Sequence, residues 1–166
     1  MTFNNSKTII GIRIRLFTAT VIFLLYIVLT YIADVIKFPL LGINEPVWTV
    51  ILVCIYLLYA FYPMILNYQY ISYSDEGDKI IFRYFTAGIV GGRKNSVEIY
   101  KSEFAGYRRD RKLFGLMQSV VLFQQIQKGV AQYPPIHISA LTKKERGRLL
   151  HSLYSFTPSD ATDVTK

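Results

Sequence analysis

Residues 16–36 read LFTATVIFLLYIVLTYIADVI and contain no charge before Asp34. As an α-helix this stretch would be about 31 Å long, which matches the hydrocarbon thickness of a bilayer. A second run, VWTVILVCIYLLYAFYPMIL at residues 47–66, contains no charged residue. A helix in the core of a soluble protein usually keeps a polar face over such a length. The two runs therefore predict two transmembrane helices, at 16–36 and 47–66, with a short loop between them.

The composition of the whole chain agrees with a membrane protein. Of 166 residues, 52% are hydrophobic and 18% are charged, whereas charged residues make up about 25% of an average soluble domain. So much apolar surface excludes disorder as the main state, and a single cysteine, Cys54, excludes a disulfide scaffold. The first run is longer than the apolar region of a signal peptide, and no small-x-small cleavage site follows it, so we expect a retained helix.

Basic residues predict the orientation. Lys7, Arg13 and Arg15 precede the first helix, while the loop at residues 37–46 has one Lys and one Glu. The positive-inside rule then places the N-terminal segment, 1–15, in the cytoplasm, the loop outside, and the C-terminal part back in the cytoplasm. The absence of basic residues just after the second helix argues weakly for the opposite orientation.

Several polar groups lie within the predicted helices. Asp34 is near the end of the first helix, so we interpret it as an interfacial residue rather than an ion or proton site. Tyr56, Tyr59 and Tyr62 recur every three residues and share one face of the second helix. This face could bind a ligand, but packing against the first helix, near Tyr26 and Tyr31, is the simpler interpretation.

From Asn67 onward the chain changes character. It holds 15 Lys and Arg against 9 Asp and Glu, a net +6 of the +8 carried by the whole chain. Its apolar residues alternate, as they do in half-buried strands, so that Ile80, Phe82 and Tyr84 fall on one face. The pattern predicts strands at 70–73, 79–85, 96–101, 103–112, 118–127 and 133–139, with a loop at 86–95.

A helix follows the predicted strands. Thr142 and Glu145 match a capping box at its start. Leu149, Leu150 and Leu153 then form an apolar stripe at helical spacing. Residues 157–166 are polar and predict a flexible tail.

Two apolar helices, six or seven antiparallel strands and one amphipathic helix are thus expected in this order. The order, together with the segments SDEGDKIIFR (74–83), LFGL (113–116) and YPPIHISAL (133–141), resembles small bacterial membrane proteins that carry a pleckstrin-homology (PH)-like domain. The resemblance implies a membrane α-helical hairpin at 16–66 plus an α+β PH-like domain at 67–156, an antiparallel β-barrel or sandwich capped by the C-terminal helix. It implies a fold and a location rather than an activity.

No catalytic motif is recognisable: the chain has no P-loop, no G-x-G-x-x-G, no H-E-x-x-H, no G-x-S-x-G and no cysteine pair. GIVGGRK at 88–94 could cradle a phosphate, but a flexible hairpin loop explains it better. His137 and His151 lack acidic or thiol ligands at useful spacing, and DEGD at 75–78 fits a turn better than a calcium loop. We therefore expect no enzyme activity, metal or cofactor, unless Asp110 or a histidine meets other polar groups in a pocket.

The segment YRRDRK at residues 107–112 is the best candidate for binding. In a strand, Arg109 and Arg111 share one face, while Arg108 and Lys112 share the other. With Arg93 and Lys94, which precede the strand predicted at 96–101, they predict a surface that contacts anionic lipid or a protein partner, and a merely solvated basic strand is the alternative. The candidate contact residues are Arg93, Lys94, Arg108, Arg109, Arg111 and Lys112.

The expected function is that of a non-enzymatic integral protein of the inner membrane, crossing it twice, whose cytoplasmic PH-like domain binds a protein partner or anionic lipid headgroups. The alternative is a small accessory subunit of a membrane transport or secretion complex that acts through its helices, with Tyr56 and Tyr59 in the contact. Expected partners are membrane lipids and either another protein or a second copy of the chain. The membrane anchor argues against nucleic acid.

A reporter fused to the C-terminus tests the predicted orientation. We expect a fluorescent cytoplasmic reporter to be active, because the basic residues before the first helix outweigh the weak opposing signal after the second. An alkaline phosphatase fusion at the same position is the control and should be inactive. An active phosphatase would contradict the predicted orientation.

Overall fold

The computed structural model describes residues 1–87 and 92–158. The chain divides into two units, which we call the helix unit (Ile10–Ile65) and the sheet unit (Met1–Ile9 with Leu66–Lys166). The first nine residues therefore belong with the second half of the chain, although the two long helices lie between them in sequence.

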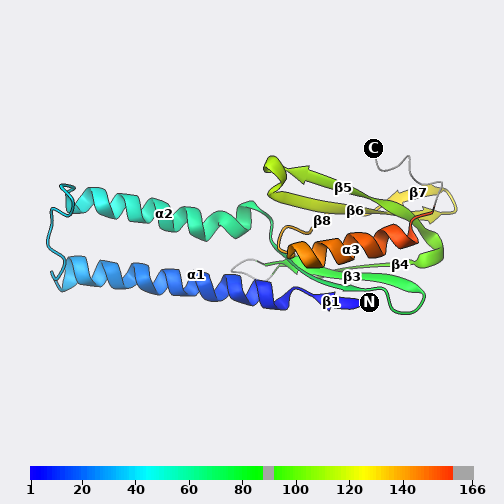
Figure 1. Ribbon diagram of the computed structural model, residues 1–166, viewed down its shortest axis with the longest axis horizontal. Helices are drawn as coiled ribbons and strands as arrows, with labels where there is room; N and C mark the ends of the chain where they lie inside the picture. Colours follow the sequence, from blue (N-terminus) through cyan, green and yellow to red (C-terminus); the bar gives the residue numbers. More distant parts are fainter. Residues whose placement is uncertain (88–91, 159–166) are drawn as a thin grey trace. The chain divides into compact units, whose positions relative to one another are not determined.

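The helix unit contains two apolar helices (Figure 1). Helix α1 (Ser6–Ile27) continues through a π-helical segment, η1 (Val28–Ile32), and helix α2 covers Glu45–Ile65. The apolar stretches of the two helices have mean hydropathies of 2.1 and 2.0. Neither stretch is buried by other parts of the chain. Both helices are long and apolar enough to span a membrane.

The first helix differs from its predicted bounds at both ends. It begins at Ser6 rather than at residue 16, because the arginines at 13 and 15 limit the part that can lie in hydrocarbon but do not interrupt a helix. The helical segment ends at Ile32 rather than at residue 36, since Asp34 adopts a left-handed backbone with a φ of 51°. The second helix lies within two residues of its prediction.

Tyrosines join the two helices. The ring of Tyr56 stacks on the ring of Phe23, with centroids 4.9 Å apart. The Thr49 hydroxyl lies 3.0 Å from the hydroxyl of Tyr26 and 2.7 Å from that of Tyr31. The prediction that the tyrosine face of the second helix packs on the first is confirmed at Tyr56.

The sheet unit is built from two antiparallel sheets and one helix (Figure 1). The first sheet has the order β1-β2-β3-β4, and the second has the order β5-β6-β7, with β8 also paired to β6. The strands are β1 (Thr2–Asn4), β2 (Gln69–Ser74), β3 (Lys79–Thr86), β4 (Asn95–Tyr100), β5 (Phe104–Lys112), β6 (Met117–Ile126), β7 (Gly129–Gln132) and β8 (Ile136–His137), and helix α3 (Lys143–Phe156) follows them.

One hydrophobic core joins both sheets to α3. The predicted inward residues Ile80, Phe82 and Tyr84 are all buried in it, as are Leu149 and Leu153 of α3. The predicted capping box is confirmed, because Thr142 and Glu145 each accept a hydrogen bond from the other's backbone N–H. Local patterns of alternation and capping therefore predicted most of this unit correctly.

Two predicted segments of the sheet unit need correction. The predicted strand at 133–139 is reduced to β8, since Pro134 and Pro135 offer no N–H for a ladder. The turn expected from Lys128 leads at once into the short strand β7, which the sequence did not predict. Of the predicted loop and tail, residues 88–91 and 159–166 lie outside the described residues.

The N-terminal strand β1 was also not predicted. It pairs with β2 in the register Thr2↔Ser74 to Asn4↔Ser72. The next residue, Asn5, is buried, and its side chain accepts a hydrogen bond from the Ile71 N–H at 2.8 Å and donates one to the Gln69 carbonyl at 2.9 Å. Residues 1–5 are therefore part of the sheet rather than a free segment.

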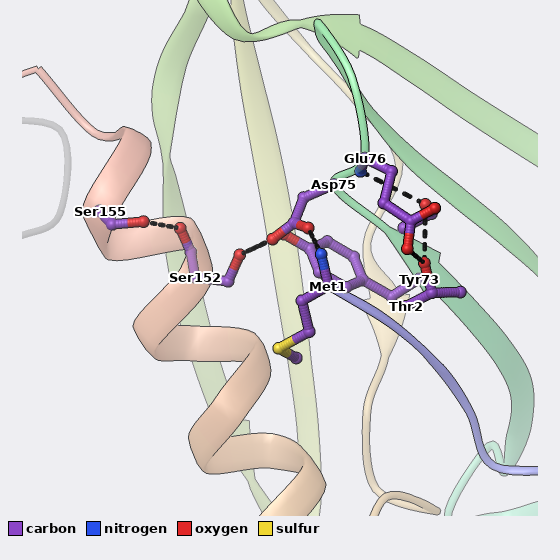
Figure 2. Close-up of polar contacts among 8 residues, drawn as sticks. Met1, Thr2, Tyr73, Asp75, Glu76, Ser152 and Ser155 are labelled. Carbon is purple, nitrogen blue, oxygen red and sulfur yellow. Dashed lines mark hydrogen bonds and ion pairs between the residues drawn. The ribbon is translucent and has the colours of Figure 1, made fainter.

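A polar network fastens this strand to α3 (Figure 2). The Asp75 carboxylate pairs with the Met1 amine and accepts a 2.6 Å hydrogen bond from the Ser152 hydroxyl. Because the Ser152 proton is used there, the Tyr73 hydroxyl 2.7 Å away donates to Ser152. Burial alone would raise the pKa of Asp75, but its hydrogen bonds to the amine and to Ser152 hold the pKa of this carboxyl below its ordinary value.

Replacing Asp75 should make stability depend less on pH. We expect Asp75→Asn to lower the free energy of unfolding of the sheet unit at neutral pH by about 1–3 kcal/mol, the usual cost of losing hydrogen bonds to a charged group. Since the folded-state pKa lies below the unfolded value of about 3.9, the stabilisation is present above that pH and is lost as the pH falls through the folded pKa. Urea denaturation in detergent, followed by near-ultraviolet circular dichroism, measures the difference.

The matched control is Asp78→Asn in the exposed turn between β2 and β3, which should leave the free energy of unfolding nearly unchanged. A difference between the wild-type chain and Asp75→Asn that stays constant down to strongly acidic pH would contradict an ionic role for Asp75.

Candidate anion-binding site

Strand β5 places two of the candidate arginines on one face, Arg109 half-buried and Arg111 exposed near the end of the strand. Arg109 lies opposite Val120 and Arg111 opposite Gln118 on β6. Directly opposed residues of antiparallel strands place their side chains on the same face, and Val120 belongs to the core. A register shift between Phe104 and the glycine at 106 decides which residues of β5 lie on this face. The predicted pairing of Arg109 and Arg111 on one face agrees with this register.

Helix α3 packs against β5 and adds a third arginine. Burial lowers the pKa of Arg109, and the charges of Arg111 and of Arg146, in the first turn of α3, lower it further. Arg111 and Arg146 therefore both lie within electrostatic reach of Arg109. We call Arg109, Arg111 and Arg146 the arginine cluster.

The arginine cluster has unsatisfied hydrogen-bond donors. Arg109 donates through Nη2 to Gln118 Oε1 at 2.8 Å, and Gln118 in turn donates to the Gly115 carbonyl at 2.8 Å. The Nε atoms of Arg109 and Arg146 are buried and have no hydrogen-bond partner. Among residues 1–87 and 92–158, no carboxylate forms an ion pair with any of the three arginines. Buried donors and an uncompensated charge of this kind fit an anion with several oxygens, such as a phosphate.

Tyr107, which is also on β5, lies next to the arginine cluster. Burial raises the pKa of its hydroxyl, the charge of Arg109 opposes that shift, and Tyr154 on α3 adds to it. The phenol therefore stays neutral and can serve as a hydrogen-bond donor beside the guanidinium groups.

The other candidate residues lie elsewhere. Arg108 points to the opposite face of β5, where its Nε donates to Asp110 at 3.1 Å and its guanidinium lies over the ring of Phe123. Lys112 is exposed at the end of the strand. Arg93 and Lys94 are exposed just before β4. The structure thus brings together Arg109 and Arg111 and separates them from Arg108.

Arg146 was missed by the sequence analysis. The signal was present, because positions 146, 149, 150 and 153 follow the i, i+3, i+4, i+7 spacing of a single helix face. The leucines of that stripe face the core. An arginine in register with them is placed beside the same core and cannot be only a solvent-facing charge.

The residues that could indicate an enzyme, Asp110, His137 and His151, have the following surroundings. Asp110 and His137 lie on either side of Ser119 in neighbouring strands, so their backbones are about 10 Å apart. Asp110 pairs with Arg108, and His151 is exposed on α3. Burial, followed by the charge of Lys112, lowers the pKa of His137.

Several basic groups lie at the end of the sheet unit where the chain arrives from α2. We call this the junction end. There Asn67 Nδ2 lies 3.8 Å from Met117 Sδ, at the start of β6, and the Ala87 N–H donates to the Tyr68 carbonyl at 2.9 Å. Lys112 is the partner of Met117 in the ladder. The turn between β5 and β6 and the beginning of α3 lie at the same end (Figure 1).

Comparisons of the chain with protein-family models, with curated proteins and with solved structures gave no match. The chemistry of the arginine cluster is therefore the basis for any functional proposal.

An added polyvalent anion should stabilise the sheet unit through this cluster. We expect pyrophosphate to raise the unfolding temperature above that in sodium chloride of equal ionic strength, with a gain of about 2.7 kcal/mol at one hundred times the dissociation constant. Arg146→Gln should remove most of the gain without destabilising the anion-free protein, because it also relieves repulsion with Arg109. Thermal unfolding in detergent measures both effects.

Arg148→Gln is the matched control, since this arginine is exposed on the same helix. Equal responses of the two variants to pyrophosphate would mean that the anion acts on the general surface charge rather than on the cluster.

Proposed function

We propose that this chain is a non-enzymatic, two-pass protein of the cytoplasmic membrane whose sheet unit is a PH-like domain that binds anionic lipid headgroups of the inner leaflet. The observation that carries the proposal is the arginine cluster, with two buried Nε donors and no carboxylate partner among the described residues. A headgroup phosphate supplies the oxygens that these donors lack.

The pairing of β1 with β2 supports an even number of crossings. β1 precedes α1 and β2 follows α2, and the two strands form one ladder. Both strands must therefore lie on the same side of any membrane that the helices cross. With the basic residues before α1, the positive-inside rule favours the cytoplasmic side.

The arrangement of the sheet unit is compatible with a PH-like domain. Two antiparallel sheets share one core, and a C-terminal helix packs its apolar stripe into that core. The added strand β1 extends the first sheet at its edge.

Charge and location favour lipid over protein as the bound partner. Near an anionic leaflet each Lys or Arg contributes about 1 kcal/mol of attraction, and Lys112, Arg93 and Lys94 add to the cluster at or near the junction end. An acidic or phosphorylated protein would satisfy the same donors. We therefore treat a protein partner as an alternative outcome of the test.

The alternative function, an accessory subunit that acts through its helices, has less support. Tyr56, one of the residues expected in such a contact, stacks on Phe23 and has its hydroxyl 3.0 Å from that of Thr20. Its polar group is thus satisfied within the helix unit. Tyr59 is exposed, as are many apolar residues of both helices, and a lipid environment explains their exposure.

Hydrogen exchange in nanodiscs tests the proposal on the full chain. We expect slower amide exchange in β5 and in the first turn of α3 when phosphatidylglycerol is added to phosphatidylcholine, because a bound headgroup restrains both elements. The double variant Arg109→Gln/Arg146→Gln should lose this lipid-dependent protection.

The control is Arg83→Gln/Arg148→Gln, which removes the same charge from two exposed positions and should keep the protection. If phosphatidylglycerol protects neither element, the lipid proposal is wrong. Cross-linking in native membranes then distinguishes a protein partner, which should be recovered by the wild-type chain and lost from the cluster variant.

A further inference from the structure

The turn between β5 and β6 carries the most exposed apolar side chain among the described residues of the sheet unit. Phe114 has a relative accessibility of 109%, and its neighbours Leu113 and Leu116 are 51% and 58% exposed. Soluble surfaces tolerate single exposed apolar residues, but three together in one protruding turn mark a site of contact with another apolar surface. We call residues 113–116 the apolar tip.

The backbone of the apolar tip is unusual. Leu113, Phe114 and Gly115 have φ values of 50°, 53° and 87°, so two bulky residues adopt the left-handed conformation that normally favours glycine. The turn is held by the Leu116 N–H, which donates to the Leu113 carbonyl at 3.1 Å, and by Gln118, which donates to the Gly115 carbonyl. A fixed turn of this kind presents its apolar side chains outward.

The position of the apolar tip is set by its contacts within the sheet unit. Met117, the residue after the tip, lies against Asn67, and α2 ends two residues before Asn67. Arg111 and Lys112 directly precede the tip. Apolar side chains flanked by basic ones, next to the point where the chain leaves a membrane-spanning helix, have the composition of interfacial segments.

We propose that the apolar tip inserts Leu113, Phe114 and Leu116 into the interfacial region of the lipid bilayer. This inference rests on the proposed membrane disposition of α1 and α2 and adds a hydrophobic contact to the proposed headgroup site. Gln118 links the two features, since it bonds both the Arg109 side chain and the Gly115 carbonyl of the tip. An inserted tip therefore brings Arg109 and Arg111 to headgroup depth. The flanking positive charges favour an anionic bilayer over an apolar surface of a second basic chain.

Tryptophan scanning with brominated lipids tests the insertion on the full chain. Trp48 is the single tryptophan, so Trp48→Phe gives a background without tryptophan emission. Into it we would place Phe114→Trp or, at a position with an ordinary backbone φ of −68°, Leu116→Trp. In vesicles of brominated phosphatidylcholine, with or without phosphatidylglycerol, we expect most of the emission at either position to be lost relative to unbrominated lipid.

The matched control is Val130→Trp, which replaces another exposed apolar residue (52%) in β7, just after the turn that joins it to β6, and should keep its emission. No quenching at both tip positions overturns the insertion, even if β5 is still protected by phosphatidylglycerol. A blue-shifted emission without quenching also overturns it, because a protein or a second copy then covers the tip. Quenching that is the same with and without phosphatidylglycerol, with no protection of β5, supports insertion and refutes only the headgroup proposal.

Discussion

The backbone ladder between Thr2–Asn4 and residues 72–74 is the constraint on which the rest of the structure depends. It joins the segment before the first apolar helix to the segment after the second. Asn5 strengthens the joint by completing the hydrogen bonds of Gln69 and Ile71 on the neighbouring strand. Because of this pairing, the chain segment with the two apolar helices starts and ends at the same sheet.

The residues on which the functional proposals rest lie toward one end of the sheet unit. The chain reaches β2 through Leu66 and Asn67, and the start of β6 lies against Asn67. The cluster of three arginines, the exposed basic residues before β4 and the turn after β5 lie toward this end.

Local sequence patterns predicted the structural features that depend on residues close together in the sequence. The alternation of Ile80, Phe82 and Tyr84 and the capping box of Thr142 and Glu145 are confirmed. β1 was missed because three residues carry no readable period and their partner lies about 70 positions away. For Arg146 the helical spacing was readable, but its proximity to Arg109 was not, since that proximity is set by the packing of α3 on β5.

The turn between β5 and β6 shows a different limit of sequence-based prediction. An apolar run such as LFGL could belong to a core, and only the three-dimensional structure shows that Phe114 contacts none of it. The proposed PH-like fold and the proposed anion are argued from architecture and charge, because no motif in the chain specifies either of them.

The separation of β1 from β2 also fixes an order of events during synthesis. β1 is synthesised first, and its partner β2 is synthesised only after both apolar helices. Contacts between such distant segments form slowly, and domains fold as units once their last strand is available. β1 and β2 therefore cannot pair, and the first sheet cannot be completed, until both apolar helices have been synthesised.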